Sequence, residues 1–295
     1  MQAIQTALAL AERRFQATFH NAPVGIAHVG MDGSFLLVNA RFCEITGYCA
    51  DALMRSGFQQ ITHADDLRAD EALLARLNRG EIPRYSMEKR YIRLDGAIVW
   101  INLTVSMMRD EDGEPELYVA VVEDLSEVRK AHHESTHDPL TGLRNRRGFA
   151  DRAQAMIDQA VHAWEPVSLV YLDLDGFKML NDRFGHEAGD QCLIDVGTLL
   201  KAYVRPMDVA ARIGGDEFVL LLSGLTDDAA TELVERLRVS LSQLVWMDDV
   251  GVSGSFGLLT TVPTADTDLA AMIRRADGAM LQAKRAGRNQ VVLAG

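Results

Sequence analysis

The stretch Arg205–Phe218, RPMDVAARIGGDEF, decides how the second half of the chain folds. Apolar residues in VAARI precede two glycines and two acids, and the apolar run FVLLLS follows them. Glycine permits the positive φ angles of a tight turn, so the pattern predicts a β-hairpin. Asp216 and Glu217 would then be presented at the hairpin tip. A solvated turn without function explains this stretch alone equally well.

A second acidic pair favours function. Asp173 and Asp175 end VSLVYLDLD, a nearly continuous apolar strand that we expect to be buried on both faces. Alternation along a strand places both acids on one face. If the two strands are neighbours, Asp173 and Asp216 converge, and Mg²⁺ is usually held by one or two carboxylates plus substrate phosphates. For Asp175 we favour a plainer role as the N-cap of the next helix.

Composition limits the class of protein. The chain has 295 residues, of which 48% are hydrophobic, which suggests two domains. The net charge of −12 argues against a nucleic-acid partner, although a metal ion can offset the charge around a single nucleotide. No apolar run is long enough for a transmembrane helix, and the N-terminus does not resemble a signal peptide. Three cysteines without a CxxC motif fit a reduced, cytoplasmic location.

The chain as a whole reads as an α+β protein. In the first half, D-G pairs at 32–33, 95–96 and 112–113 lie between apolar runs and predict hairpins of an antiparallel sheet with short helices. In the second half, strands alternate with longer amphipathic helices that would cover a sheet. We expect a helix over 1–10, one domain over 11–124, a helical linker over 125–137 and a second domain over 138–295. The linker reads equally well as a helix that pairs with a second chain and as a solvated connector.

The first half resembles a PAS domain. The resemblance covers about residues 11–127 and is carried by FHNAPVGIAHVGMDGSFLLVNARFCEITGY, ITHADDL, EKRYIRLDGAIVW and VVEDLSE, in that order. It implies a sensory or dimerising module, whose ligand (haem, flavin, a small molecule or none) stays unknown. His20, His28 and His63 are candidate haem ligands by residue type only, and a polar or loop histidine is the favoured interpretation of each.

The second half resembles the GGDEF-domain diguanylate cyclases. Four separated motifs carry the resemblance over residues 133–294: HDPLTGLRNRRGF, DLDGFKMLNDRFGHEAGD, RIGGDEF and AKRAGRN. The family condenses two GTP molecules into cyclic di-GMP and releases pyrophosphate. Its fold resembles the palm of nucleotide cyclases and polymerases, with a sheet flanked by helices.

The resemblance implies roles for individual residues. Mg²⁺ or Mn²⁺ would be held by Asp173, Asp216 and the backbone carbonyl of Leu174. The catalytic residues would be Asp216, Glu217 and Lys178. Which acid is the general base stays open. Metal ions would lower the pKa of the attacking 3′-hydroxyl and neutralise phosphate charge.

Substrate and product contacts are also implied. GTP would be bound by Phe177, Lys178, Asn181, Asp190, Lys284 and Arg288. Asn181 and Asp190 would read guanine, since a carboxylate accepts from both N1–H and the 2-amino group. Lys178, Lys284 and Arg288 would contact phosphates, with Lys284 and Arg288 one turn apart if their helix continues that far. Product would inhibit at Arg205, Asp208 and Arg236.

Two functions from different classes follow. One is an active, PAS-regulated diguanylate cyclase that works as a homodimer, because each domain of the family holds one GTP. The other is a catalytically inactive receptor that binds cyclic di-GMP and dimerises. The presence of both metal carboxylates favours the cyclase.

Overall fold

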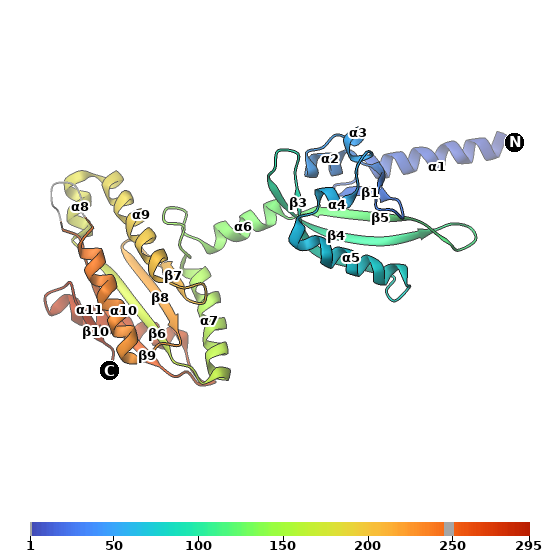
Figure 1. The fold of residues 1–295 in the computed structure, drawn as a ribbon. Helices are drawn as coiled ribbons and strands as arrows, with labels where there is room; N and C mark the ends of the chain where they lie inside the picture. Colours follow the sequence, from blue (N-terminus) through green and yellow to red (C-terminus); the bar gives the residue numbers. More distant parts are fainter. Residues whose placement is uncertain (1, 245–250) are drawn as a thin grey trace. The chain divides into compact units, whose positions relative to one another are not determined.

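A computed structural model describes residues 2–244 and 251–295 of the chain (Figure 1). The chain divides into two units, Met1–Lys130 and Ala131–Gly295, and each is described by itself. None of the described helices has the length and hydrophobicity needed to cross a membrane.

The first unit is built on a five-stranded antiparallel sheet with strand order β2-β1-β5-β4-β3. Its strands are β1 (Gly25–Val29), β2 (Phe35–Val38), β3 (Arg84–Ile92), β4 (Ile98–Arg109) and β5 (Pro115–Asp124). Its helices are α1 (Gln2–His20), α2 (Ala40–Thr46), α3 (Ala50–Leu53), α4 (Phe58–Ile61) and α5 (Ala64–Asn78). The three D-G pairs lie between antiparallel neighbours, and Gly33, Gly96 and Gly113 all have positive φ, so the predicted hairpins are confirmed.

The first helix is longer than the range 1–10 that the sequence predicts. It extends to His20 because Phe15 and Phe19 stack on one another and both pack against the ring of His28 in β1, so the last turns are held by the domain. Met1 lies outside the described residues.

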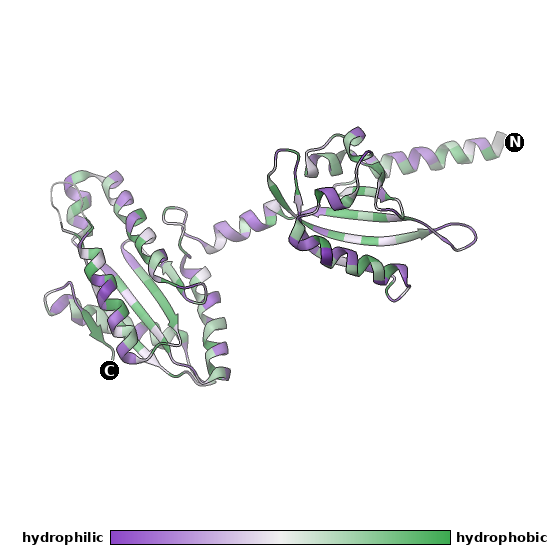
Figure 2. Ribbon diagram, viewed as in Figure 1, coloured by the Kyte–Doolittle hydropathy of each residue, from purple (hydrophilic) through white to green (hydrophobic). Residues whose placement is uncertain are grey.

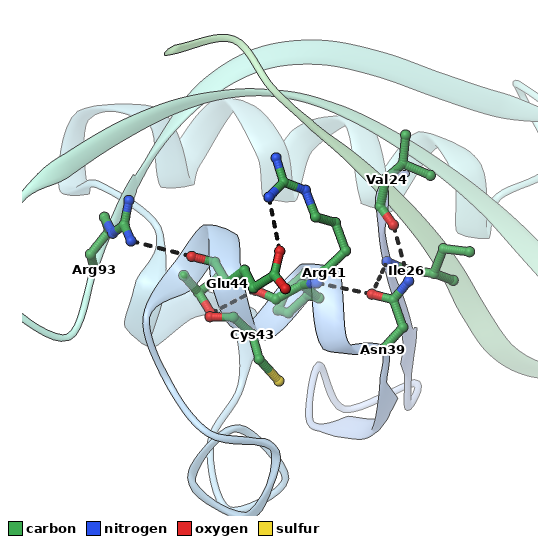
Figure 3. Close-up of polar contacts among 9 residues, drawn as sticks. Val24, Ile26, Asn39, Arg41, Cys43, Glu44 and Arg93 are labelled. Atoms are coloured by element: carbon green, nitrogen blue, oxygen red, sulfur yellow. Dashed lines mark hydrogen bonds and ion pairs between the residues drawn. The ribbon is translucent and has the colours of Figure 1, made fainter. Parts of the chain in front are cut away.

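Asn39 connects α1, β1 and α2, and Figure 3 shows its contacts with Val24 and Ile26. Its side-chain amide donates to the carbonyls of Phe19 and Val24, at 2.9 and 3.0 Å, and its Oδ1 accepts from the backbone N–H groups of Ile26 and Phe42 at 2.9 Å. All four hydrogen-bonding positions of this fully buried amide are therefore used. The contact with Phe42 is the N-cap of α2.

The helix α6 (Ser126–Thr136) lies within the range 125–137 that the sequence predicts as a helical linker, and it begins in the first unit and ends in the second. The ring of His133 in α6 stacks on that of His137, just after the helix, with their centroids 3.8 Å apart.

The second unit is a five-stranded sheet with strand order β10-β9-β6-β8-β7, in which only the β9–β10 pair is parallel. Its strands are β6 (Val167–Asp175), β7 (Val209–Arg212), β8 (Glu217–Ser223), β9 (Ser253–Thr261) and β10 (Val291–Leu293). Its helices are α7 (Arg146–Ala163), α8 (Phe177–Phe184), α9 (His186–Tyr203), α10 (Asp227–Ser242) and α11 (Leu269–Arg285).

Helices cover both faces of this sheet. One apolar cluster joins α7 and α11 to the strands, and another joins α9 and α10 to the opposite face. Every residue of β6 is buried, and Figure 2 shows hydrophobic residues concentrated on the strands. The mixed α+β architecture and the sheet flanked by helices agree with the sequence-based expectation.

Candidate functional site

An open pocket of about 610 Å³ lies where β6 ends and α8 begins. Eight residues that the sequence analysis singled out line it: Asp173, Leu174, Asp175, Phe177, Lys178, Asp216, Lys284 and Arg288. They come from β6, α8, the β7–β8 turn, α11 and the turn after α11. The fold therefore brings predicted acidic and basic residues from distant parts of the chain to one strand end.

The two acidic motifs are neighbours because β6 pairs with β8. Asp173 lies directly opposite Glu217 in the antiparallel register, and the Leu174 N–H donates to the Asp216 carbonyl at 3.2 Å. This confirms the condition on which convergence of Asp173 and Asp216 depended.

Lys284 forms an ion pair with the buried Asp173, with 2.6 Å between Nζ and Oδ1. Burial raises the pKa of Asp173, and the charges of Asp216 and Glu217 raise it further, whereas the hydrogen bond and charge of Lys284 oppose the increase. The carboxylates thus form a region of excess negative charge that one ammonium group offsets only in part.

The glycine pair has a different role from the one that we predicted. Neither Gly214 nor Gly215 has positive φ. Instead, a Cβ on Gly214 would lie 2.6 Å from Glu217 Oε2, so glycine gives the carboxylate room. The other oxygen of Glu217 accepts a hydrogen bond from the Tyr171 hydroxyl at 3.1 Å. Glu217 therefore faces Tyr171 of β6 and is not among the residues that line the pocket.

Asp175 is not the helix cap that we predicted. The N-cap of α8 is Gly176, whose φ of 83° suits glycine. The carboxylate of Asp175 turns instead toward β9, where Ser253 and Ser255 donate to it, and toward the turn at 288–289.

The predicted one-turn spacing of Lys284 and Arg288 is also wrong. Helix α11 ends at Arg285, and Arg288 lies in a turn with a φ of 64°. Gly287, with a φ of 118°, ends the helix before Arg288 can belong to it. Both side chains nevertheless reach the same pocket.

Asn181 and Asp190 are held near one another by close packing of α8 on α9. The Oδ1 atom of Asn181 is buried against Gly189, and a Cβ on Gly189 would overlap it. No hydrogen-bond donor within the described residues reaches this oxygen. Asp190 follows Gly189 and is exposed. Sequence reasoning missed Gly189, although a glycine inside a helical pattern signals close packing.

Arg205, Asp208 and Arg236 lie around one corner of the second unit. Asp208 accepts from the backbone N–H groups of Arg205 and Ser223, at 2.9 and 3.1 Å, so its carboxylate shapes the turn. Tyr203 donates to the Arg236 carbonyl at 3.3 Å and thereby joins α9 to α10. The side chains of Arg205 and Arg236 are exposed.

A further contact connects the turn after α6 to the β7–β8 turn. Arg212 Nη1 lies 3.2 Å from both oxygens of Asp138, and its Nε donates to the Gly215 carbonyl at 3.0 Å. Sequence reasoning missed this pair because nothing in the spacing of residues 138 and 212 indicates that they meet.

The first unit contains an internal cavity between its sheet and helices. An ion pair borders it, with 2.5 Å between Lys89 Nζ and Asp70 Oδ2 and less than 2% of either side chain exposed. His20, His28 and His63 are not among its lining residues. His63 instead caps α5, and His28 packs on Phe19, which supports the structural interpretation of both histidines.

The donor set near the pocket suits a divalent cation bound together with phosphates. Within residues 2–244 and 251–295, no group of three or more metal-ligating side chains is gathered closely enough to hold an ion alone. The buried Asp173 beside Asp216 matches the one or two carboxylates that Mg²⁺ takes when substrate phosphates complete its coordination.

Comparison with known proteins assigns both units. Residues 135–290 match the family model described as "Diguanylate cyclase, GGDEF domain", which covers more than half of the chain. The chain belongs to the GGDEF diguanylate cyclase family. Residues 35–122 match the PAS fold, so the PAS and GGDEF resemblances are both confirmed.

Curated relatives match part of this chain. The bifunctional diguanylate cyclase/cyclic di-GMP phosphodiesterase MucR of Pseudomonas aeruginosa is 37% identical over 65% of this chain and 28% of its own length. The response regulator PleD of Caulobacter vibrioides is 36% identical over 52% of this chain and 35% of its own length. The chain therefore spans about a third of the length of these relatives.

Solved structures resemble the second unit. The coiled coil and GGDEF domain of DgcB from Caulobacter crescentus, in complex with c-di-GMP, has a TM-score of 0.53 and 29% identity and covers 57% of this chain and 90% of its own. The GGDEF domain of TpbB (YfiN) from Pseudomonas aeruginosa has a TM-score of 0.50 and 36% identity over 54% of this chain and 94% of its own.

Proposed function

We propose that the chain is a diguanylate cyclase that joins two GTP molecules into cyclic di-GMP. Each new bond between a 3′-oxygen and an α-phosphorus releases one pyrophosphate, so two are released in all. The observation that carries the proposal is the pocket at the end of β6, where Asp173 and Asp216 lie with Lys178, Lys284 and Arg288. The lysine and arginine side chains can bind the negatively charged triphosphate, and the two carboxylates can bind a divalent metal ion.

Asp173, Asp216 and the carbonyl of Leu174 would hold Mg²⁺ or Mn²⁺, which when bound neutralises phosphate charge and lowers the pKa of the attacking hydroxyl. Lys178 and Arg288 are exposed at the pocket and would bind phosphate oxygens. Lys284 would exchange its contact with Asp173 for the triphosphate. Asp216 or Glu217 would accept the proton of the 3′-hydroxyl.

Guanine would bind beside Asn181 and Asp190. The Asn181 amide can donate to guanine, while the exposed carboxylate of Asp190 can accept from N1–H and the 2-amino group. The same carboxylate would face an acceptor at N1 of adenine, which favours GTP over ATP.

One pocket holds one GTP, so the reaction requires two copies of the domain face to face. We propose a homodimer in the cytoplasm, where GTP is available, with the PAS unit setting activity in response to an unidentified signal. Product would inhibit at Arg205, Asp208 and Arg236, whose exposed guanidinium groups can bind phosphate.

The test uses the full chain with GTP and Mg²⁺ and follows cyclic di-GMP and pyrophosphate by chromatography. Asp216→Ala should lower turnover by roughly a hundredfold or more, because it removes a metal ligand. Asp158→Ala, an exposed acid on α7, is the matched control and should be fully active. A wild-type chain that binds cyclic di-GMP but forms none, even after bound product has been stripped, would instead be a receptor.

Arg205→Ala tests the inhibitory site separately. It should keep the initial rate and lose inhibition by added cyclic di-GMP. Unchanged inhibition would remove Arg205 from the site.

A further inference from the structure

Asp175 is the second acid of the β6 motif, and its carboxylate accepts hydrogen bonds from three protein donors. The residue is only 6% exposed. Ser255 Oγ lies 2.8 Å from Oδ1 and 3.0 Å from Oδ2, and Ser253 Oγ lies 3.2 Å from Oδ2. The backbone N–H of Asn289 also donates to Oδ2, at 3.1 Å. These donors occupy the oxygens that a metal ion would need.

The turn that Asp175 contacts has an unfavourable backbone. Arg288 and Asn289 are two consecutive residues with positive φ, at 64° and 44°, and neither is glycine. Such residues persist only where surrounding contacts hold them. Asp175 supplies the N–H acceptor for Asn289, and Arg238 donates to Asn289 Oδ1 at 3.0 Å.

The same turn carries a cationic side chain into the pocket. Arg288 Nε lies 3.9 Å from Asp175 Oδ1, while the arginine side chain is 65% exposed. Asp175 therefore contacts the stem side of the guanidinium group and leaves its remaining N–H groups free for an incoming anion. Both residues line the pocket together with Lys178 and Lys284.

We propose that Asp175 is a positioning residue that fixes the 288–289 turn and thereby holds Arg288 for the triphosphate of GTP. This inference rests on the proposed function. It assigns different roles to the two acids of the motif, because Asp173 would act on the metal ion and Asp175 acts through Arg288. It also explains the serines of β9, which hold the carboxylate in its orientation.

The test measures binding of 3′-deoxy-GTP, which lacks the attacking hydroxyl, to the full chain with saturating Mg²⁺ by calorimetry. Arg288→Ala should weaken binding by about tenfold or more, the usual effect of a charge-assisted phosphate contact. Asp175→Asn should weaken it by a similar factor. The affinity of the double variant should be within about threefold of that of Arg288→Ala, because the two changes remove the same interaction.

Two results would overturn the positioning role. If the losses from Asp175→Asn and Arg288→Ala multiply in the double variant, the acid acts independently of the arginine. If Asp175→Asn raises the Mg²⁺ concentration for half-maximal binding severalfold while Arg288→Ala does not, Asp175 is a metal ligand. Asp158→Asn, a change of an exposed acid on α7 that has no contact with the 288–289 turn, is the control for loss of a carboxylate and should bind normally.

Hydrogen exchange tests the turn without any variant. The Asn289 amide should exchange slowly in the wild-type chain, although the turn is exposed, because its N–H is bonded to Asp175. Exchange at the rate of a free loop amide would contradict the proposal even if Asp175→Asn does not fold. Because the analogue cannot react, its binding is measured independently of turnover. A chain that binds the analogue as expected but makes no cyclic di-GMP from GTP would therefore count against the proposed reaction and leave the role of Asp175 in nucleotide binding intact.

Discussion

Lys284 of α11 contacts Asp173 of β6, with 2.6 Å between Nζ and Oδ1, at the place where the acids of two adjacent strands meet. The ammonium group supplies part of the positive charge that Asp173, Asp216 and Glu217 require. In the proposed function, it would be released when a metal ion and a triphosphate bind. The ion pair is therefore a resting arrangement of the pocket.

This arrangement predicts that the buried, ionised Asp173 lowers the stability of the second unit. The pKa of Asp173 is raised, so the folded state binds its proton more tightly than the unfolded state does. Ionised Asp173 therefore lowers the free energy of unfolding at neutral pH. This penalty disappears as pH falls below 3.8, the ordinary pKa of an aspartate. Asp173→Asn should raise the melting temperature of the second unit at pH 7 by about 2–4 °C, the shift that roughly 1 kcal/mol produces.

Calorimetry at pH 7 and pH 4 checks this expectation, with Asp158→Asn as the exposed control. The gain should be smaller at pH 4. A lower melting temperature at pH 7 would mean that the contact with Lys284 outweighs burial and repulsion.

Gly189→Ala should weaken GTP binding. The added Cβ would overlap Asn181 Oδ1, so the amide must leave its position or α8 must move away from α9. We expect KM for GTP to rise by about tenfold, which corresponds to one lost hydrogen bond of roughly 1.4 kcal/mol.

Gly278→Ala is the matched control, since no atom lies within 4 Å of its added Cβ. That variant should stabilise α11 by about 0.5–1 kcal/mol. An unchanged KM in a folded Gly189→Ala chain would remove Asn181 from the guanine site.

Asp138→Asn should destabilise the second unit in a pH-dependent way. Burial alone would raise the pKa of Asp138, but hydrogen bonds from Thr141 and the charge of Arg212 lower it. Ionised Asp138 therefore stabilises the folded state fully at pH values above 3.8, the ordinary pKa of an aspartate. This stabilisation is lost as pH falls through the lowered pKa of Asp138. Urea unfolding at pH 7 should show a loss of about 1–3 kcal/mol, as for a hydrogen bond to a charged group.

Asp268→Asn provides the comparison for that experiment. Its pair with Arg274 is exposed, with 3.5 Å between the charged atoms, and asparagine can still cap α11. We expect a change below about 0.5 kcal/mol. Equal effects of the two substitutions at pH 7 would show that the contact with Arg212 adds nothing.

Lys89→Met should destabilise the PAS unit by about 3–5 kcal/mol, since it leaves the charge of Asp70 buried without a cationic partner. Adding Asp70→Asn should recover at least half of that loss, because the amide is neutral and can still accept from Tyr85. Arg79→Met, which breaks an exposed pair with Glu81, should have a much smaller effect because solvent screens that pair. A double variant less stable than Lys89→Met in urea would contradict the charge argument.

Much of this arrangement is predictable from sequence. Hydrophobic alternation and the D-G pairs predict the sheets. The positions of Asp173 and Asp216 at the ends of two strands predict that the two acids meet, provided that those strands are neighbours. The exceptions are the places where backbone geometry depends on distant contacts. Arg288 and Asn289 adopt positive φ because Asp175 and neighbouring groups hold them, and no local signal indicates this. Gly214 is needed for the space that Glu217 occupies rather than for a turn angle.

The contact between Asp175 and Asn289 also has a consequence for how activity is acquired. The two residues are 114 positions apart, so the pocket is completed only when the last strand-forming segment of the chain has docked. Contacts of such long sequence separation form late, after loop-closure entropy has been overcome. During synthesis and refolding, the pocket should therefore form after secondary structure does, so that formation of the complete pocket reports a fully folded second unit.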